Sequence, residues 1–89
     1  MGIQVIITRH ARDRIRARGA DPELENEVRR VVRQAAPFAP RWPEAAAAIF
    51  SPGLPVEPVV KYLNNRKAIV TTALPPGVPL KPNTEAVYV

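Results

Sequence analysis

The distribution of proline is the strongest constraint on how this chain can fold. Six of its eleven prolines lie between residues 36 and 58, at positions 37, 40, 43, 52, 55 and 58. Proline lacks a backbone N–H and fixes φ, so this density is too high for one regular element to span the segment. Since 89 residues leave room for only one core, we expect a single domain over residues 1–89 with a proline-rich connection at about 36–58.

The residues before this connection predict a strand followed by a helix. The β-branched run at 3–8 is typical of a strand, and its apolar residues on both faces predict a central position in a sheet. A helix is expected over 9–18, because Thr8 can act as its N-cap. Gly19 follows directly and is predicted to end that helix in the left-handed conformation.

A second helix should begin at Asp21 and end before Pro37. Asp21 is a favourable N-cap, and Pro22 suits the first helical position. Acidic residues come first and arginines come last, which complements the helix dipole and accounts for Arg29, Arg30 and Arg33. Glu25 and Arg29 also have the spacing of an i,i+4 ion pair. The apolar stripe, about 100° wide, consists of Leu24, Val28, Val31, Val32 and Ala35.

The rest of the chain predicts strands, with one segment left open. Residues 59–63 and 67–74 are typical of two strands joined by a tight turn, and 84–89 of a final strand. The segment 43–50 fits a helical turn at its start and the beginning of a strand at its end, and both alternatives remain. The expected fold class is therefore α+β, with an N-terminal strand, two helices and then a twisted antiparallel sheet.

Composition excludes several classes of function. The chain has no cysteine and one histidine, which excludes disulfides and thiol catalysis and argues against a transition-metal site. We expect neither a metal nor a cofactor. No apolar run approaches a membrane span, and the N-terminus has no signal-peptide pattern, so the expected location is cytoplasmic, without membrane contact. The high proline content fits either a thermostable protein or the codon bias of a GC-rich genome.

The charge of the chain indicates a polyanionic partner. The formal net charge is +5 and the predicted pI is about 10.5, values typical of nucleic-acid-binding domains. Ten of the thirteen basic residues are arginine, the side chain best suited to bidentate phosphate contacts.

The stretch TRHARDRIRARG at 8–19 concentrates five arginines and the only histidine. In a helix, residues four apart share a face, so Ala11 and Ile15 are expected to face the sheet. The ridge beside that contact would consist of His10, Arg14 and Arg18. The arginines expected to point towards solvent are Arg9, Arg12 and Arg16.

The pattern His10-Ala11-x-x-Arg14-x-x-x-Arg18-Gly19, followed by a helix with an acidic start, resembles a family of small bacterial and phage proteins classed as a domain of unknown function. Those proteins are similar to RelE/ParE-type and BrnT-type toxins. The resemblance covers residues 7–32 closely and the rest loosely. It implies a RelE/ParE-like fold, metal-independent endoribonuclease activity, RNA as the target, and an antitoxin or other protein partner, with the chain a monomer or homodimer.

Metal-free RNA cleavage requires a general base, a general acid and cations that stabilise the phosphorane. Imidazole titrates near neutral pH, so His10 is the candidate acid or base, and Arg14 can hold the phosphate. The resemblance places further functional residues on late strands, which favours Tyr88 and Thr84 over Tyr62. The predicted catalytic residues are His10, Arg14 and Tyr88. The predicted nucleic-acid-binding residues are Arg9, Arg12, Arg16, Arg18, Lys61 and Thr84.

Other interpretations compete with this one. His10 can instead cap a backbone group or pack against the sheet, and the chain can be a non-catalytic module that binds nucleic acid or protein. A third interpretation is a stable domain whose basic face only mediates self-association. Trp42, the only tryptophan, is expected to cover the core rather than to stack on a base.

Overall fold

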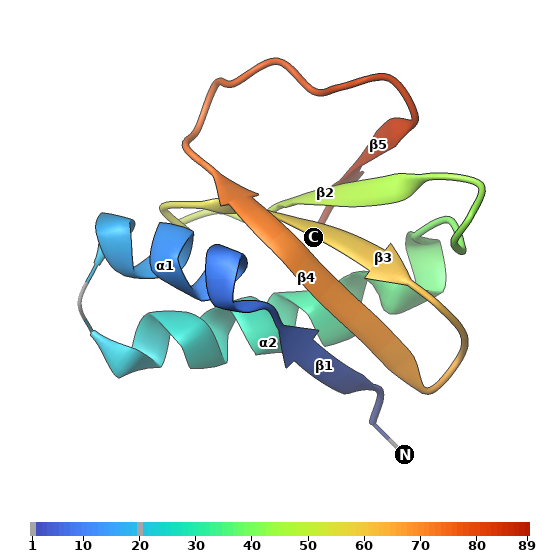
Figure 1. Ribbon diagram of the computed structural model, residues 1–89, viewed down its shortest axis with the longest axis horizontal. Coiled ribbons are helices and arrows are strands. Elements are labelled where there is room, and N and C mark those ends of the chain that lie inside the picture. The colour runs from blue at the N-terminus through green and yellow to red at the C-terminus, as the bar shows by residue number, and fades with distance from the viewer. Residues whose placement is uncertain (1, 20) are drawn as a thin grey trace.

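Two helices cover one face of a five-stranded sheet in the computed structural model, which describes residues 2–19 and 21–89 (Figure 1). The strand order across the sheet is β1-β4-β3-β2-β5. The strands are β1 (Gln4–Ile7), β2 (Ala46–Phe50), β3 (Glu57–Tyr62), β4 (Lys67–Leu74) and β5 (Thr84–Tyr88). The helices are α1 (Arg9–Arg18), α2 (Pro22–Ala35) and the short 3-10 helix η1 (Ala36–Phe38). The predicted α+β class is confirmed.

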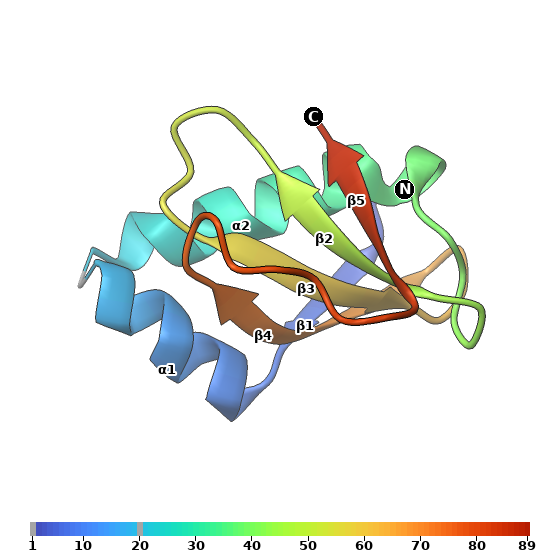
Figure 2. The same ribbon diagram turned by 90° about the horizontal axis from the view of Figure 1, so that it is seen from above.

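The sheet is mixed, so the prediction of an antiparallel sheet is wrong for its two outer strands. β3 pairs antiparallel with β2 and β4, whereas β1 is parallel to β4 and β5 is parallel to β2. β5 runs parallel to β2 because of the path of the segment that connects β4 to β5. After β4, residues 75–83 run across the sheet to its far edge, and the chain then enters β5 in the direction of β2 (Figure 2).

β1 is an edge strand, and the prediction of a central strand is also wrong. Val5 is buried on the helix side, whereas Ile6, on the other face, is only half-buried. The prediction assumed that a strand with apolar residues on both faces lies between two others, but β1 pairs with β4 alone. The free edge is covered by α2 instead. Arg29 Nη1 donates to the carbonyl of Val5, and Arg33 Nε donates to that of Ile3 at 3.2 Å. These arginines satisfy an edge that would otherwise be open to pairing.

The helix starts are confirmed, whereas the predicted end of α1 is wrong. Thr8 Oγ1 accepts from the amide of Ala11 at 3.1 Å, and an Asp21 carboxylate oxygen caps α2. Gly19 is extended, with φ −176° and ψ 129°, rather than left-handed. Its backbone leads away from α1 towards the Asp21 cap instead of folding back over the last turn.

The core lies between the helices and the sheet. From α1 it contains Ala11 and Ile15, as the helical spacing predicted. Four members of the α2 stripe are buried, and Leu24 packs against them partly buried. Tyr62 is the largest fully buried side chain, and its hydroxyl donates to the carbonyl of Val32 at 2.6 Å. Burial raises the pKa of Tyr62.

The open alternative at 43–50 resolves as β2, which begins at Ala46. Ala47 and Ala48 are fully buried, and β2 lies between β3 and β5. Trp42 precedes this strand and is 46% exposed, so the prediction that it covers the core is wrong. Its ring instead lies against the ammonium group of Lys61.

Candidate nucleic-acid interface

A groove of about 560 Å³ lies between the sheet, the crossing segment 75–83 and the first turn of α1. Since Tyr62 points to α2, strand alternation turns its neighbour Lys61 to the face opposite α2. The polar lining of the groove consists of His10, Lys61, Thr71, Thr72, Lys81 and Thr84. Its apolar floor and wall consist of Ala46, Val59, Leu74, Val78, Pro79 and Leu80. No acidic side chain is among these lining residues of the described chain.

Thr8 fixes the start of α1 against β4 and so brings His10 to the groove. Its hydroxyl accepts from the Ala11 amide and donates to the carbonyl of Thr71 at 3.3 Å. Its own amide donates to the carbonyl of Val70 at 3.1 Å. Two bonds therefore hold the helix start to the strand, the third caps the helix itself, and His10 is exposed in the first turn beside the groove.

A β-bulge in β4 adds two hydroxyls to the lining. Val59 pairs with Thr72 and Val60 pairs with Val70, which leaves Thr71 without a partner in the register. The Thr71 hydroxyl donates to the carbonyl of Val59 at 3.3 Å. Because a bulge interrupts the alternation of a strand, two consecutive threonines line the same groove.

Two lysines give the groove its positive charge. Lys61 Nζ lies 4.2 Å from the centroid of the Trp42 ring, a cation–π contact that holds the ammonium group in place without neutralising it. Lys81 is exposed and comes from the crossing segment. Neither lysine forms an ion pair within the part of the chain that the structure describes. The groove is therefore cationic and lined with hydroxyls, as a site for a phosphate group requires.

The structure brings three of the predicted site residues together and separates others. His10, Lys61 and Thr84 line the same groove. Tyr88 lies at the other end of β5, where its ring stacks on Phe50 with centroids 5.0 Å apart. It lines a different pocket and does not reach His10. Tyr62, the weaker alternative, is buried against α2.

The arginines of α1 do not line the groove. Four of them, Arg9, Arg14, Arg16 and Arg18, are exposed along the helix. Of the ridge formed by His10, Arg14 and Arg18, only His10 lines the groove. Phosphate contact by the exposed arginines stays a prediction.

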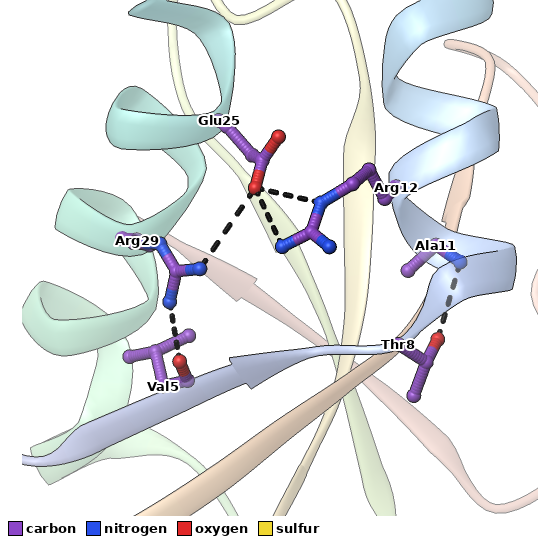
Figure 3. A network of polar contacts seen from close by, with 6 residues as sticks. All are labelled: Val5, Thr8, Ala11, Arg12, Glu25 and Arg29. Atoms are coloured by element: carbon purple, nitrogen blue, oxygen red, sulfur yellow. Dashed lines mark hydrogen bonds and ion pairs between the residues drawn. The ribbon is translucent and has the colours of Figure 1, made fainter. Parts of the chain in front are cut away.

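Arg12 has a structural partner, as Figure 3 shows. Its Nε and Nη2 atoms both lie 2.9 Å from Oε1 of Glu25, which joins α1 to α2. Arg29 Nη2 lies 3.8 Å from the same oxygen, and Arg29 continues the network to the carbonyl of Val5. The predicted pair of Glu25 and Arg29 exists, but the closer contact is the one between the two helices.

Sequence reasoning missed Thr71, Thr72 and Lys81. A signal for the threonines was present: the apolar alternation of Ala68 and Val70 resumes one residue late, at Ala73. A Thr-Thr pair at such a break is typical of a bulge. No sequence pattern pointed to Lys81, because only the path of the crossing segment places it beside the sheet.

Comparison of the chain with protein-family models, with curated proteins and with solved structures gives no match. Among the described residues, no three acidic or histidine side chains are grouped so that they could hold a metal ion. No helix in residues 2–19 and 21–89 has the length and apolar character needed to cross a membrane. Function is therefore inferred from the groove and the chemistry of its lining.

Proposed function

We propose that this chain is a toxin-like RNA-acting protein that binds the phosphate backbone of RNA in the groove at His10. The observation that supports the proposal is the lining itself. One imidazole, two ammonium groups and the hydroxyls of Thr72 and Thr84 line a groove without a carboxylate, while the hydroxyl of Thr71 donates to the carbonyl of Val59. Donors of this kind bind the non-bridging oxygens of a phosphodiester. The resemblance to RelE/ParE-type toxins favours RNA over other polyanions.

The same groups suit cleavage of RNA by transesterification. The His10 imidazole takes the proton of a 2′-hydroxyl, and the 2′-oxygen forms a bond to phosphorus as the bond from phosphorus to the 5′-oxygen breaks. An ammonium group, from Lys61 or Lys81, gives its proton to the leaving 5′-oxygen. The other ammonium stabilises the charge on the phosphorane. The products are a 2′,3′-cyclic phosphate and a free 5′-hydroxyl.

Binding without turnover is the second candidate function, and the position of Tyr88 favours it. With Tyr88 in a separate pocket, His10 is the only histidine or tyrosine among the described residues that line the groove. A nucleic-acid-binding regulator requires only the cations and hydroxyls. For either function, a protein partner with acidic side chains would block RNA by occupying the same groove.

The two functions separate in one experiment with single-stranded RNA in EDTA. Wild type is compared with His10→Ala and with the control Arg30→Gln, which removes a charge that Glu27 neutralises on the exposed face of α2. Cleavage by wild type and Arg30→Gln that is lost in folded His10→Ala supports the enzyme. Equal cleavage by all three proteins rules His10 out as the base.

If the RNA remains intact, the affinity of each protein for RNA tests whether the groove is the binding site. Lys61→Gln should reduce the slope of log affinity against log salt by about 0.7, the value for one lost phosphate contact on a single strand. Arg30→Gln should leave that slope unchanged. Equal RNA affinity and equal salt slope for wild type, His10→Ala and Lys61→Gln would overturn the proposed site for both functions.

A further inference from the structure

A second pocket, of about 420 Å³, lies where β2 ends, β3 begins and the chain leaves β5. Its walls include Phe50, Leu54, Val56, Pro76 and Tyr88, and Glu57 also lines it. Glu57 is only 7% exposed, and among the described residues it is the one charged residue that is buried. Its Oε1 atom is inaccessible to solvent and has no hydrogen-bond donor within residues 2–19 and 21–89. None of the described ion pairs includes Glu57.

A buried carboxylate without a donor is a rare arrangement. Buried polar groups in folded proteins are nearly always hydrogen-bonded, and buried charges are nearly always paired. Here the surroundings supply no compensation. Val56, which precedes Glu57, is 1% exposed, and the wall is mostly apolar or aromatic. Its one other polar residue, Ser51, forms no hydrogen bond to Glu57 Oε1. Glu57 is therefore in the state expected of a carboxylate whose cationic partner comes from outside the chain.

The aromatic wall indicates which kind of cation fits. The rings of Phe50 and Tyr88 stack with centroids 5.0 Å apart and an angle of 23° between their planes. Tyr88 is 75% exposed, so the pocket opens to solvent on that side. Aromatic faces attract cations, and a planar guanidinium both stacks on a ring and donates two parallel hydrogen bonds to a carboxylate.

We propose that this pocket binds a guanidinium group on an alkyl chain, such as that of arginine. The guanidinium donates to the Glu57 carboxylate, whose side chain turns towards the pocket so that its buried oxygen becomes reachable, and the methylene chain lies against Phe50 and Tyr88 at the mouth of the pocket. The guanidinium belongs either to free arginine or to an arginine side chain of another polypeptide. This site is separate from the groove at His10, and its test involves no RNA.

The test is a titration followed by the amide signals of the labelled full chain. The probes are L-arginine, its neutral isostere L-citrulline, and a blocked peptide with one arginine. Arginine should cause saturable shifts at Phe50, Glu57 and Val89, and citrulline should bind at least about tenfold more weakly because it cannot pair with a buried charge. Tighter binding of the peptide than of arginine identifies a protein partner, and the reverse identifies a small molecule.

Variants identify the groups responsible. Glu57→Gln keeps the shape of the side chain and should lose at least about tenfold in arginine affinity. Tyr88→Ala changes a residue that is 75% exposed, and it should weaken binding as well. Glu85→Gln, on the exposed part of β5, is the control and should bind as wild type does. Equal affinity for citrulline, undiminished binding by folded Glu57→Gln, or no saturable shift at millimolar arginine would each overturn the proposal.

Discussion

Glu25 joins the two helices, and its replacement by glutamine should measurably destabilise the fold. Its Oε1 atom accepts a hydrogen bond from Arg12 Nε at 2.9 Å, and it lies 2.9 Å from Arg12 Nη2 and 3.8 Å from Arg29 Nη2. The Glu25 side chain is 20% exposed and that of Arg12 is 36% exposed. Glu25→Gln keeps the size of the side chain and removes the charge that both arginines share.

The expected loss follows from that partial burial. Hydrogen bonds to charged groups contribute about 1.5–3 kcal/mol when well shielded, whereas exposed ion pairs contribute about 0–1 kcal/mol. For a pair between these limits, Glu25→Gln should lower the free energy of unfolding by about 1–2 kcal/mol. In a domain of this size, each 1 kcal/mol corresponds to a fall in Tm of about 4–8 °C.

The matched control is Glu27→Gln. Its contact with Arg30 is shorter, at 2.7 Å, but both side chains are about half exposed, at 50% and 52%. Solvent screening should make its effect clearly smaller than that of Glu25→Gln. Thus exposure, and not distance, decides which pair stabilises the protein.

Urea unfolding of both variants at low and high salt makes the comparison. A double-mutant cycle with Arg12→Met should give a coupling energy to Glu25 of about 1 kcal/mol. If Glu27→Gln costs as much as Glu25→Gln, or if that coupling energy is zero within error, then Glu25 does not join the helices energetically.

Two further changes test how the core and the helix start are held. Tyr62→Phe should lower the free energy of unfolding by about 1 kcal/mol in urea, because the hydroxyl bond to Val32 is lost. Burial raises the pKa of Tyr62 in the folded protein, so the unfolded chain loses its phenolic proton first as the pH rises. Stability from this group is therefore full below pH about 10 and falls above it. Tyr62→Phe should reduce the fall in the free energy of unfolding at alkaline pH, whereas Tyr88→Phe should not change it. If the fall is the same in Tyr62→Phe as in wild type, it does not come from Tyr62. Thr8→Ala should cost about 1 kcal/mol in thermal unfolding, since the cap and the bond to Thr71 are lost. Thr8→Ser should restore most of it, and a stable Thr8→Ala would show that α1 is held in another way.

Local chemistry was enough to predict the helices and four of the strands, β1, β3, β4 and β5. Thr8 and Asp21 are caps whose side chains bond to amides within three residues, so the sequence around them contains the whole interaction. The stripe of α2 follows from helical periodicity alone. β4 also begins and ends where predicted, since its apolar run is bounded by an Asn-Asn-Arg turn and a pair of prolines.

Features that depend on distant segments were not predictable in this way. The alanines of β2 have weak strand propensity, and their strand conformation comes from pairing with β3 and β5 on either side. The edge position of β1 depends on Arg29 and Arg33, which satisfy its free carbonyls from another element. The parallel direction of β5 depends on the path of the crossing segment.

The candidate site shows the same division. His10 could be placed beside the sheet from helical spacing, and Lys61 and Thr84 from strand positions, and all three line the groove. Tyr88 was predicted to join them because the resemblance places functional residues on late strands, and Tyr88 lies in the same strand as Thr84. Tyr88 is four residue steps further along the strand than Thr84, about 13 Å, so the two ends of β5 line different pockets.

The central claim is that RNA binds in the groove at His10. Amide signals of the labelled protein, titrated with a single-stranded RNA whose 2′-hydroxyls are methylated to prevent cleavage, test it most directly. The account predicts that the largest shifts fall on the groove, at His10, Lys61, Thr71, Thr72, Lys81 and Thr84. Shifts confined to the exposed arginines of α1, or no shifts at low salt, would contradict it.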